Sequence, residues 1–176
     1  QNDDCEYLPD YLKDSQKLLH NKDLIELDTQ HLKSKMGFET IFSSDWKYYQ
    51  ETFLSIVSET CFDNNSIYFS EKTIKPLLHM HPFIMMSTPY TLQKLNELGF
   101  KTFDGFIDES YDREEQTKAR FEMILCEIDK FKDKSIGELK SWWTDILPTL
   151  EHNQKRLLEL GQQKTKKIKL LENLYD

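Results

Sequence analysis

A short polar triplet, Ser70-Glu71-Lys72, carries the residue types best suited to chemistry in this 176-residue chain. The apolar spacing that begins after Glu71 predicts a helix, and the hydroxyl of Ser70 is suited to cap its first turn. Helix N-termini present unpaired N–H groups and a partial positive charge, which favours phosphate. The ammonium of Lys72 adds a full charge, and the carboxylate of Glu71 can accept hydrogen bonds from ribose or sugar hydroxyls. The triplet therefore predicts a site for an anionic ligand.

Two further side chains are expected to belong to this site. Glu59 follows a predicted buried strand at residues 53–58, and Lys75 shares with Lys72 a helix face that is distinct from the apolar one. In open parallel sheets, ligands bind beyond the carboxyl ends of the strands, which is where Glu59 would lie. The alternative interpretation is a plain surface ion pair between neighbouring Glu and Lys residues, worth about 0.3–0.5 kcal/mol.

The elements around the triplet alternate between strand and helix. Apolar runs at residues 53–58 and 83–86 predict two buried strands, and the alternating pattern at 100–103 predicts a third. Helices are expected between them, with a kink or a short first turn at Pro76 in the first one. This alternation predicts a parallel sheet with right-handed crossovers, which is an α/β fold with a Rossmann-like sheet.

The rest of the C-terminal part is expected to be helical after an acidic loop at residues 104–112. Asp112 with Glu115, and Ser135 with Glu138, have the spacing of capping boxes. A helix through residues 121–131 is expected to bury its apolar residues, Phe121 and Leu125 included. Pro148 is expected to break the following helical pattern in two.

The predicted organisation has three parts. Residues 1–45 form an N-terminal helical or irregular segment with a short strand candidate at 24–27, residues 46–112 form a Rossmann-like core that carries the predicted ligand site, and residues 113–176 form helices that pack on the core. A helix near Trp46 leads into the core.

Composition and charge restrict the partners. The formal net charge is −8, so general binding to nucleic acid is not expected, because phosphate contacts need a surplus of Lys and Arg. No long apolar run is present, so no membrane span is expected. The three cysteines, Cys5, Cys61 and Cys126, have no paired spacing, which favours a reducing compartment, such as the cytoplasm, over a disulfide framework.

Metal binding and cofactors are not expected. His79 and His81 are two residues apart, so on a helix they would point in different directions. The acidic residues of the 104–112 loop lack the spacing of a calcium-binding loop, and a solvated or capping role is the default interpretation for them. Trp142 and Trp143 could stack on sugars, although helix packing is the simpler role.

The same stretch resembles the donor-binding motif of the alpha-1,3-fucosyltransferase family. That family has a strand that ends in a Glu-Asn-Ser-like triplet, a short loop, a Tyr-Val-Thr-Glu-Lys segment that opens a helix, and a Pro-Val-Val strand. The corresponding segments of this chain are residues 53–60, 68–72 and 81–85.

The chain looks closer still to glycosyltransferase-like proteins of phages and large DNA viruses. They share the patterns Glu-Lys-Thr-x-Lys-Pro, Pro-Phe-Ile, Gly-Phe-Lys-Thr-Phe and Glu-Ser-Tyr-Asp, which match residues 71–76, 82–84, 99–103 and 109–112. The resemblance covers about residues 46–131.

The resemblance implies a glycosyltransferase that binds a nucleotide-diphospho-sugar donor and transfers the sugar to an acceptor glycan or protein. The resemblance implies that Lys72 contacts the diphosphate, that Glu71 contacts the ribose or the donor sugar, and that Glu59 lines the same pocket. The chain would be the donor-binding half of an enzyme with two Rossmann-like domains, and a preceding acceptor domain would supply the base. The alternative is a non-enzymatic assembly module, possibly viral, that has a glycosyltransferase-like fold and works within a larger assembly.

Overall fold

The computed structural model describes the backbone of residues 46–63 and 66–172, with side chains in 49–63 and 66–163. The predictions for residues 1–45, including the strand at 24–27, lie outside the described residues. The chain divides into two compact units, Gln1–Glu51 and Thr52–Asp176. Within the first unit the structure describes helix α4 (Trp46–Glu51), as expected near Trp46. All other described elements belong to the second unit.

Two short strands form the centre of the second unit. β1 (Ser55–Ser58) and β2 (Phe83–Met86) pair in parallel, with Val57 opposite Met85. The described residues contain no further strand in this sheet. Nearly all of β2 is buried, as expected for an apolar run in a parallel sheet. The structure thus shows a mixed α/β fold with a two-stranded parallel sheet and a majority of helices.

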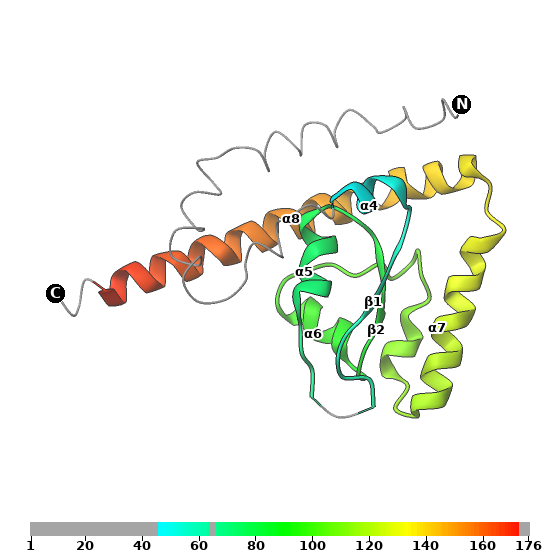
Figure 1. Cartoon of the computed structure of the whole chain (residues 1–176), viewed down its shortest axis with the longest axis horizontal. Helices are drawn as coiled ribbons and strands as arrows, with labels where there is room; N and C mark the ends of the chain where they lie inside the picture. The colour runs from blue at the N-terminus through cyan, green and yellow to red at the C-terminus, as the bar shows by residue number, and fades with distance from the viewer. Residues whose placement is uncertain (1–45, 64–65, 173–176) are drawn as a thin grey trace. The chain divides into compact units, whose positions relative to one another are not determined.

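Helices α5 (Glu71–Leu78), α6 (Thr91–Glu97) and α7 (Thr117–Lys132) surround the strands. In Figure 1 the strands run between α5 and α6 on one side and α7 on the other. α5 begins as predicted, because the hydroxyl of Ser70 accepts the N–H of Lys72 at 3.2 Å. It continues through Pro76, whose ring is buried.

The third predicted strand, residues 100–103, does not form. The segment has no regular secondary structure and buries Phe100 and Phe103, and its backbone bonds to side chains instead of to β2. Asn153 bonds the N–H and the carbonyl of Lys101, and Glu109 accepts the N–H of Phe103 at 2.7 Å. Side chains therefore satisfy the backbone groups that a strand ladder would have satisfied.

Helix α8 (Ile136–Glu172) runs without a break through Pro148, so the prediction of two separate helices is wrong. A proline in a helix interior costs about 3 kcal/mol. Here Ile146 and Leu150 are buried on either side of the exposed Pro148. Their burial in one apolar face offsets that cost.

The predicted capping boxes have different outcomes. Ser135 and Glu138 form one, since both the N–H and the hydroxyl of Ser135 donate to Glu138 Oε2, at 2.8 and 2.7 Å. Asp112 instead lies in a 3₁₀ helix, η1 (Glu109–Arg113), and its carboxylate accepts the N–H groups of Leu92 and Gln93 at the start of α6. α7 begins only at Thr117.

The exposure of α7 also differs from the prediction. Phe121 and Leu125 are 39% and 44% exposed. The buried positions of this helix are Arg120, Ile124 and Glu127. The polar members of this stripe face inward because they bond to the backbone of neighbouring loops.

A band of polar residues on α8 bonds to the C-terminal ends of α5 and α6. Gln154 donates to the carbonyl of Leu78 at 2.7 Å. Arg156 donates to the carbonyl of Leu98 at 2.8 Å, and the ring Nε2 of His152 lies 2.9 Å from the carbonyl of Gly99. Helix C-termini have carbonyls without an intrahelical partner, and this band satisfies some of them. α8 is therefore bound at the end of α5 opposite its N-terminus.

In the described part of the chain, none of the helices has both the length and the apolar character that a membrane crossing requires.

Candidate functional site

The end of β1 is tied to the start of α5 by the carboxylate of Glu59. Glu59 follows β1 directly and is 4% exposed. Its Oε1 accepts the backbone N–H of Ser70 at 2.9 Å and the hydroxyl of Thr73 at 2.5 Å. Two of the predicted site residues, Glu59 and Ser70, therefore meet at the first turn of α5.

The two charged residues of the triplet are exposed on the first turn of α5. The side chains of Glu71 and Lys72 have no hydrogen bond or ion pair with any residue that the structure describes. The surface ion pair that was the alternative interpretation of the triplet is therefore not formed. Lys75 lies further along α5 and is half-buried. A lysine at a helix start keeps its full charge for an incoming anion only where no carboxylate neutralises it.

The loops that follow the two strands meet at the carboxyl edge of the sheet. Ser87 follows β2 and is buried, and its hydroxyl donates to the carbonyl of Cys61, which lies beyond β1, at 3.4 Å. Cys61 and Cys126 are both free thiols. The ends of the two strands are thus joined by a direct contact between the loops that follow them.

Arg120 on α7 holds this edge together, and the sequence analysis did not identify it. Its guanidinium is 1% exposed and donates to the carbonyls of Ser87 at 3.2 Å and Glu114 at 2.8 Å, and also to those of Glu115 and Phe62. Burial lowers the pKa of Arg120. Arg120 lies four residues before Ile124 and seven before Glu127, which is the spacing of one helix face. This spacing is the signal in the sequence from which the burial of Arg120 on α7 could have been predicted.

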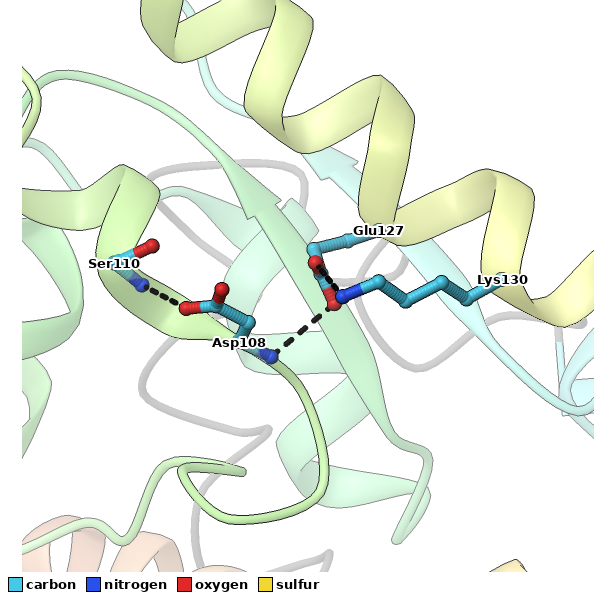
Figure 2. Close-up of polar contacts among 4 residues, drawn as sticks. All are labelled: Asp108, Ser110, Glu127 and Lys130. Atoms are coloured by element: carbon cyan, nitrogen blue, oxygen red, sulfur yellow. Dashed lines mark hydrogen bonds and ion pairs between the residues drawn. The ribbon is translucent and has the colours of Figure 1, made fainter.

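The acidic loop is organised by hydrogen bonds within the protein (Figure 2). Asp108 Oδ1 accepts the N–H of Ser110 at 3.0 Å, and hydrogen bonds from the side chain and the backbone of Ser110 lower the pKa of Asp108. The N–H of Asp108 donates to Glu127 Oε2 on α7 at 3.2 Å, and Lys130 forms an ion pair with the same carboxylate. Asp108 is the N-cap of η1, so it has the capping role that was the default interpretation of the loop.

Two other carboxylates of the loop region are partly or fully buried. Glu109 Oε1 accepts the N–H of Phe103, and burial raises the pKa of Glu109 to about 7. Burial also raises the pKa of Asp112, although the N–H groups at the start of α6 act in the opposite direction. Among the described residues, no group of three or more His, Cys, Asp or Glu side chains is arranged to hold a metal ion.

His81 has a packing role. It is buried, its Nδ1 lies 2.9 Å from the hydroxyl of Ser55, and its ring makes an edge contact with Trp143 at a centroid distance of 5.7 Å. Burial lowers the pKa of His81, so the neutral ring is favoured. The same contact assigns Trp143 to packing.

Comparison of the chain with protein-family models, with curated proteins and with solved structures found no match. The functional interpretation therefore depends on the residues at the start of α5. There Glu59 and Ser70 are bonded to each other, while the charged ends of Glu71 and Lys72 are exposed without a described partner.

Proposed function

We propose that the chain binds a nucleotide-diphospho-sugar at the N-terminus of α5, as the donor-binding part of a glycosyltransferase with a Rossmann-like sheet. The observation that carries this proposal is the exposed ammonium of Lys72 on the first turn of the helix that follows β1. A parallel strand, a loop and a helix start with an unneutralised lysine are the elements that commonly bind phosphate.

Each residue has a distinct role in this proposal. Lys72 binds the diphosphate, with Lys75 contributing charge from the next turn. Glu71 accepts hydrogen bonds from hydroxyls of the ribose or the donor sugar. Ser70 and Glu59 fix the start of the helix through their mutual bond, so that the charged residues are presented in one position.

The chemical requirement of sugar transfer is twofold. The leaving diphosphate needs a positive charge, and the acceptor hydroxyl needs a general base. Lys72 supplies the first. In this proposal a preceding acceptor domain supplies the base and binds the acceptor glycan or protein, and the reaction takes place in the cytoplasm, that of a host cell if the chain is viral.

Calorimetric titration of the full chain with GDP- and UDP-sugars tests this proposal. We expect binding of at least one nucleotide sugar, and a loss of roughly tenfold in affinity or more in Lys72→Ala, because charge-assisted bonds to phosphate are worth about 1.5–3 kcal/mol. Lys118→Ala is the matched control. Lys118 is an exposed lysine on α7, outside the candidate site, and its ammonium pairs with Glu122 at 3.8 Å. Absence of binding at millimolar nucleotide, or equal affinities of the Lys72→Ala and Lys118→Ala variants, would refute the proposal.

A second candidate is a non-enzymatic assembly module that uses the same fold. The observation that favours it is the exposure of apolar side chains on and near β1: Ile56 is 51% and Tyr68 58% exposed. Parallel strands are usually covered on both faces. Light scattering coupled to gel filtration separates the two candidates. An assembly module forms stable oligomers that the substitution Ile56→Ser dissociates. Monomers that turn over a nucleotide sugar would exclude the assembly module.

A further inference from the structure

The second carboxylate oxygen of Glu59 has no hydrogen-bond partner among the residues that the structure describes. Glu59 is 4% exposed, and its Oε2 is buried without a donor, whereas Oε1 accepts two hydrogen bonds. Both of these bonds come from the first turn of α5, from Ser70 and Thr73. The carboxylate therefore lies against the N-terminus of this eight-residue helix.

An unpartnered oxygen of this kind is energetically unfavourable. A buried acceptor without a donor costs about 1–3 kcal/mol, and more when it is charged. Native proteins contain few such groups, and many occur at functional sites. Oε2 differs in this respect from Oε1, whose two donors are supplied by the fold itself. No described residue supplies a donor to Oε2, so its donor would be a water molecule or a ligand group.

The chemistry of Oε2 restricts the group that it can meet. A carboxylate oxygen only accepts hydrogen bonds, so a phosphate oxygen is repelled while a hydroxyl is bound. Lys72, which lies on the same turn of α5, has the opposite preference. The turn thus offers one position for a phosphate and one for a hydroxyl. Oε2 is itself buried, so a ligand hydroxyl reaches it only when the side chains that cover it move aside.

We propose that Glu59 Oε2 accepts a hydrogen bond from a hydroxyl of the bound ligand, next to the diphosphate that Lys72 binds. The proposal rests on the proposed function and deepens it, because it makes a hydroxyl a requirement for tight binding. Ribose and the donor sugar both carry such hydroxyls. A ligand with phosphates alone lacks this contact.

The test compares ligands that differ only in their hydroxyls, by calorimetry on the full chain. GDP is compared with 2′,3′-dideoxy-GDP for the ribose, and GDP-mannose with its deoxymannose analogues for the sugar. UDP and UDP-glucose are compared with their deoxy analogues in the same way, while inorganic pyrophosphate reports the phosphate contacts alone. We expect a loss of about ten- to a hundredfold in affinity when the relevant hydroxyl is absent, because a hydrogen bond to a charged acceptor is worth about 1.5–3 kcal/mol.

The variant Glu59→Gln provides the second arm. A glutamine keeps one oxygen for Ser70 and Thr73 but places an amide NH₂ where Oε2 was, so it cannot accept from the ligand. We expect it to remove the advantage of the hydroxyl-bearing ligand without weakening pyrophosphate binding, because the variant removes a negative charge that repels phosphate. Glu122→Gln, an exposed position on α7, is the control.

The outcomes separate this inference from the proposed function. Nucleotide binding that depends on Lys72 but is insensitive to every hydroxyl removal overturns the role of Glu59 and leaves the proposed function standing. Absence of binding by any of the nucleotides and by pyrophosphate overturns both. If Glu59→Gln fails to fold, the comparison of ligands on the unaltered chain still decides.

Discussion

Asn153 on α8 forms both of its side-chain hydrogen bonds with the backbone of one residue, Lys101. The N–H of Lys101 donates to Oδ1 at 2.7 Å, and Nδ2 donates to the carbonyl of Lys101 at 2.8 Å. Asn153 is 1% exposed. The amide thus imitates the neighbouring strand that residues 100–103 lack.

Asn153→Ala should destabilise the protein strongly. The substitution removes both part-buried hydrogen bonds to the backbone of Lys101, each worth about 0.5–1.5 kcal/mol, so we expect a loss of about 1–3 kcal/mol in the free energy of unfolding, measured in urea. Gln154→Ala is the control, because it removes one bond to the carbonyl of Leu78 and should cost about 1 kcal/mol. Equal losses in the two variants would contradict this role of Asn153.

Glu109 should make stability depend on pH. Burial raises the pKa of Glu109 from 4.5 to about 7, so the folded protein binds a proton that the unfolded chain releases between these values. The resulting stabilisation is fully present below pH 4.5 and is lost as the pH rises towards 7, because the unfolded state then binds fewer protons than the folded state.

The variant Glu109→Gln should lack this loss, since glutamine still accepts the N–H of Phe103 but does not titrate. Relative to Glu109→Gln, we expect the unaltered protein to lose up to about 3 kcal/mol between pH 4.5 and 7. His81, whose pKa burial lowers, acts in the opposite direction, but its effect cancels in this difference. Urea unfolding curves at several pH values measure it, and a difference that stays constant with pH would refute it.

Arg120 should be the most sensitive position at the carboxyl edge of the sheet. Arg120→Met leaves the carbonyls of Ser87, Glu114, Glu115 and Phe62 without their buried donor. We expect a loss of about 3–5 kcal/mol, because several carbonyls lose a donor, at about 1–3 kcal/mol for each acceptor that stays buried.

Arg120→Lys provides a finer comparison with the same charge. Lysine has a single donor centre and cannot reproduce the fork that reaches several carbonyls, so we expect it to recover only part of the loss. The exposed Arg113→Lys should change stability by less than about 0.5 kcal/mol. Thermal unfolding followed by circular dichroism compares the three variants, and full recovery in Arg120→Lys would show that charge alone matters.

The sequence predicted those features that depend on local pattern. The apolar runs around Val57 and Ile84 identified two buried strands, and their parallel pairing followed from the helix between them. The cap at Ser70 and the capping box of Ser135 and Glu138 were also predictable, because each involves residues within four positions of each other.

The features that the sequence did not predict depend on distant partners. Residues 100–103 have the alternation of a strand, but Asn153, 52 positions from Lys101, takes the backbone bonds. Asp112 caps α6 through the N–H of Leu92, which lies 20 positions before it. In the candidate site, the triplet was predictable from its residue types, whereas the unequal bonding of the two oxygens of Glu59 depends on how β1 and α5 meet.

Gly99 should tolerate alanine less well than Gly105, although both have a left-handed backbone, with φ of +88° and +89°. A Cβ on Gly105 would meet no atom within 4 Å, so Gly105→Ala should cost about 1–2 kcal/mol from the backbone conformation alone. A Cβ on Gly99 would lie 2.7 Å from Nε of Arg156, which donates to the carbonyl of Leu98.

Gly99→Ala should therefore displace Arg156 and cost about 1 kcal/mol more than Gly105→Ala, because the hydrogen bond to Leu98 is lost as well. Arg156→Ala loses that bond in advance, so the double variant Gly99→Ala/Arg156→Ala should be less destabilised than the sum of its parts. Urea unfolding of the four variants measures this coupling. Strict additivity, together with equal losses for the two alanine substitutions, would show that Arg156 is not what requires a glycine at position 99.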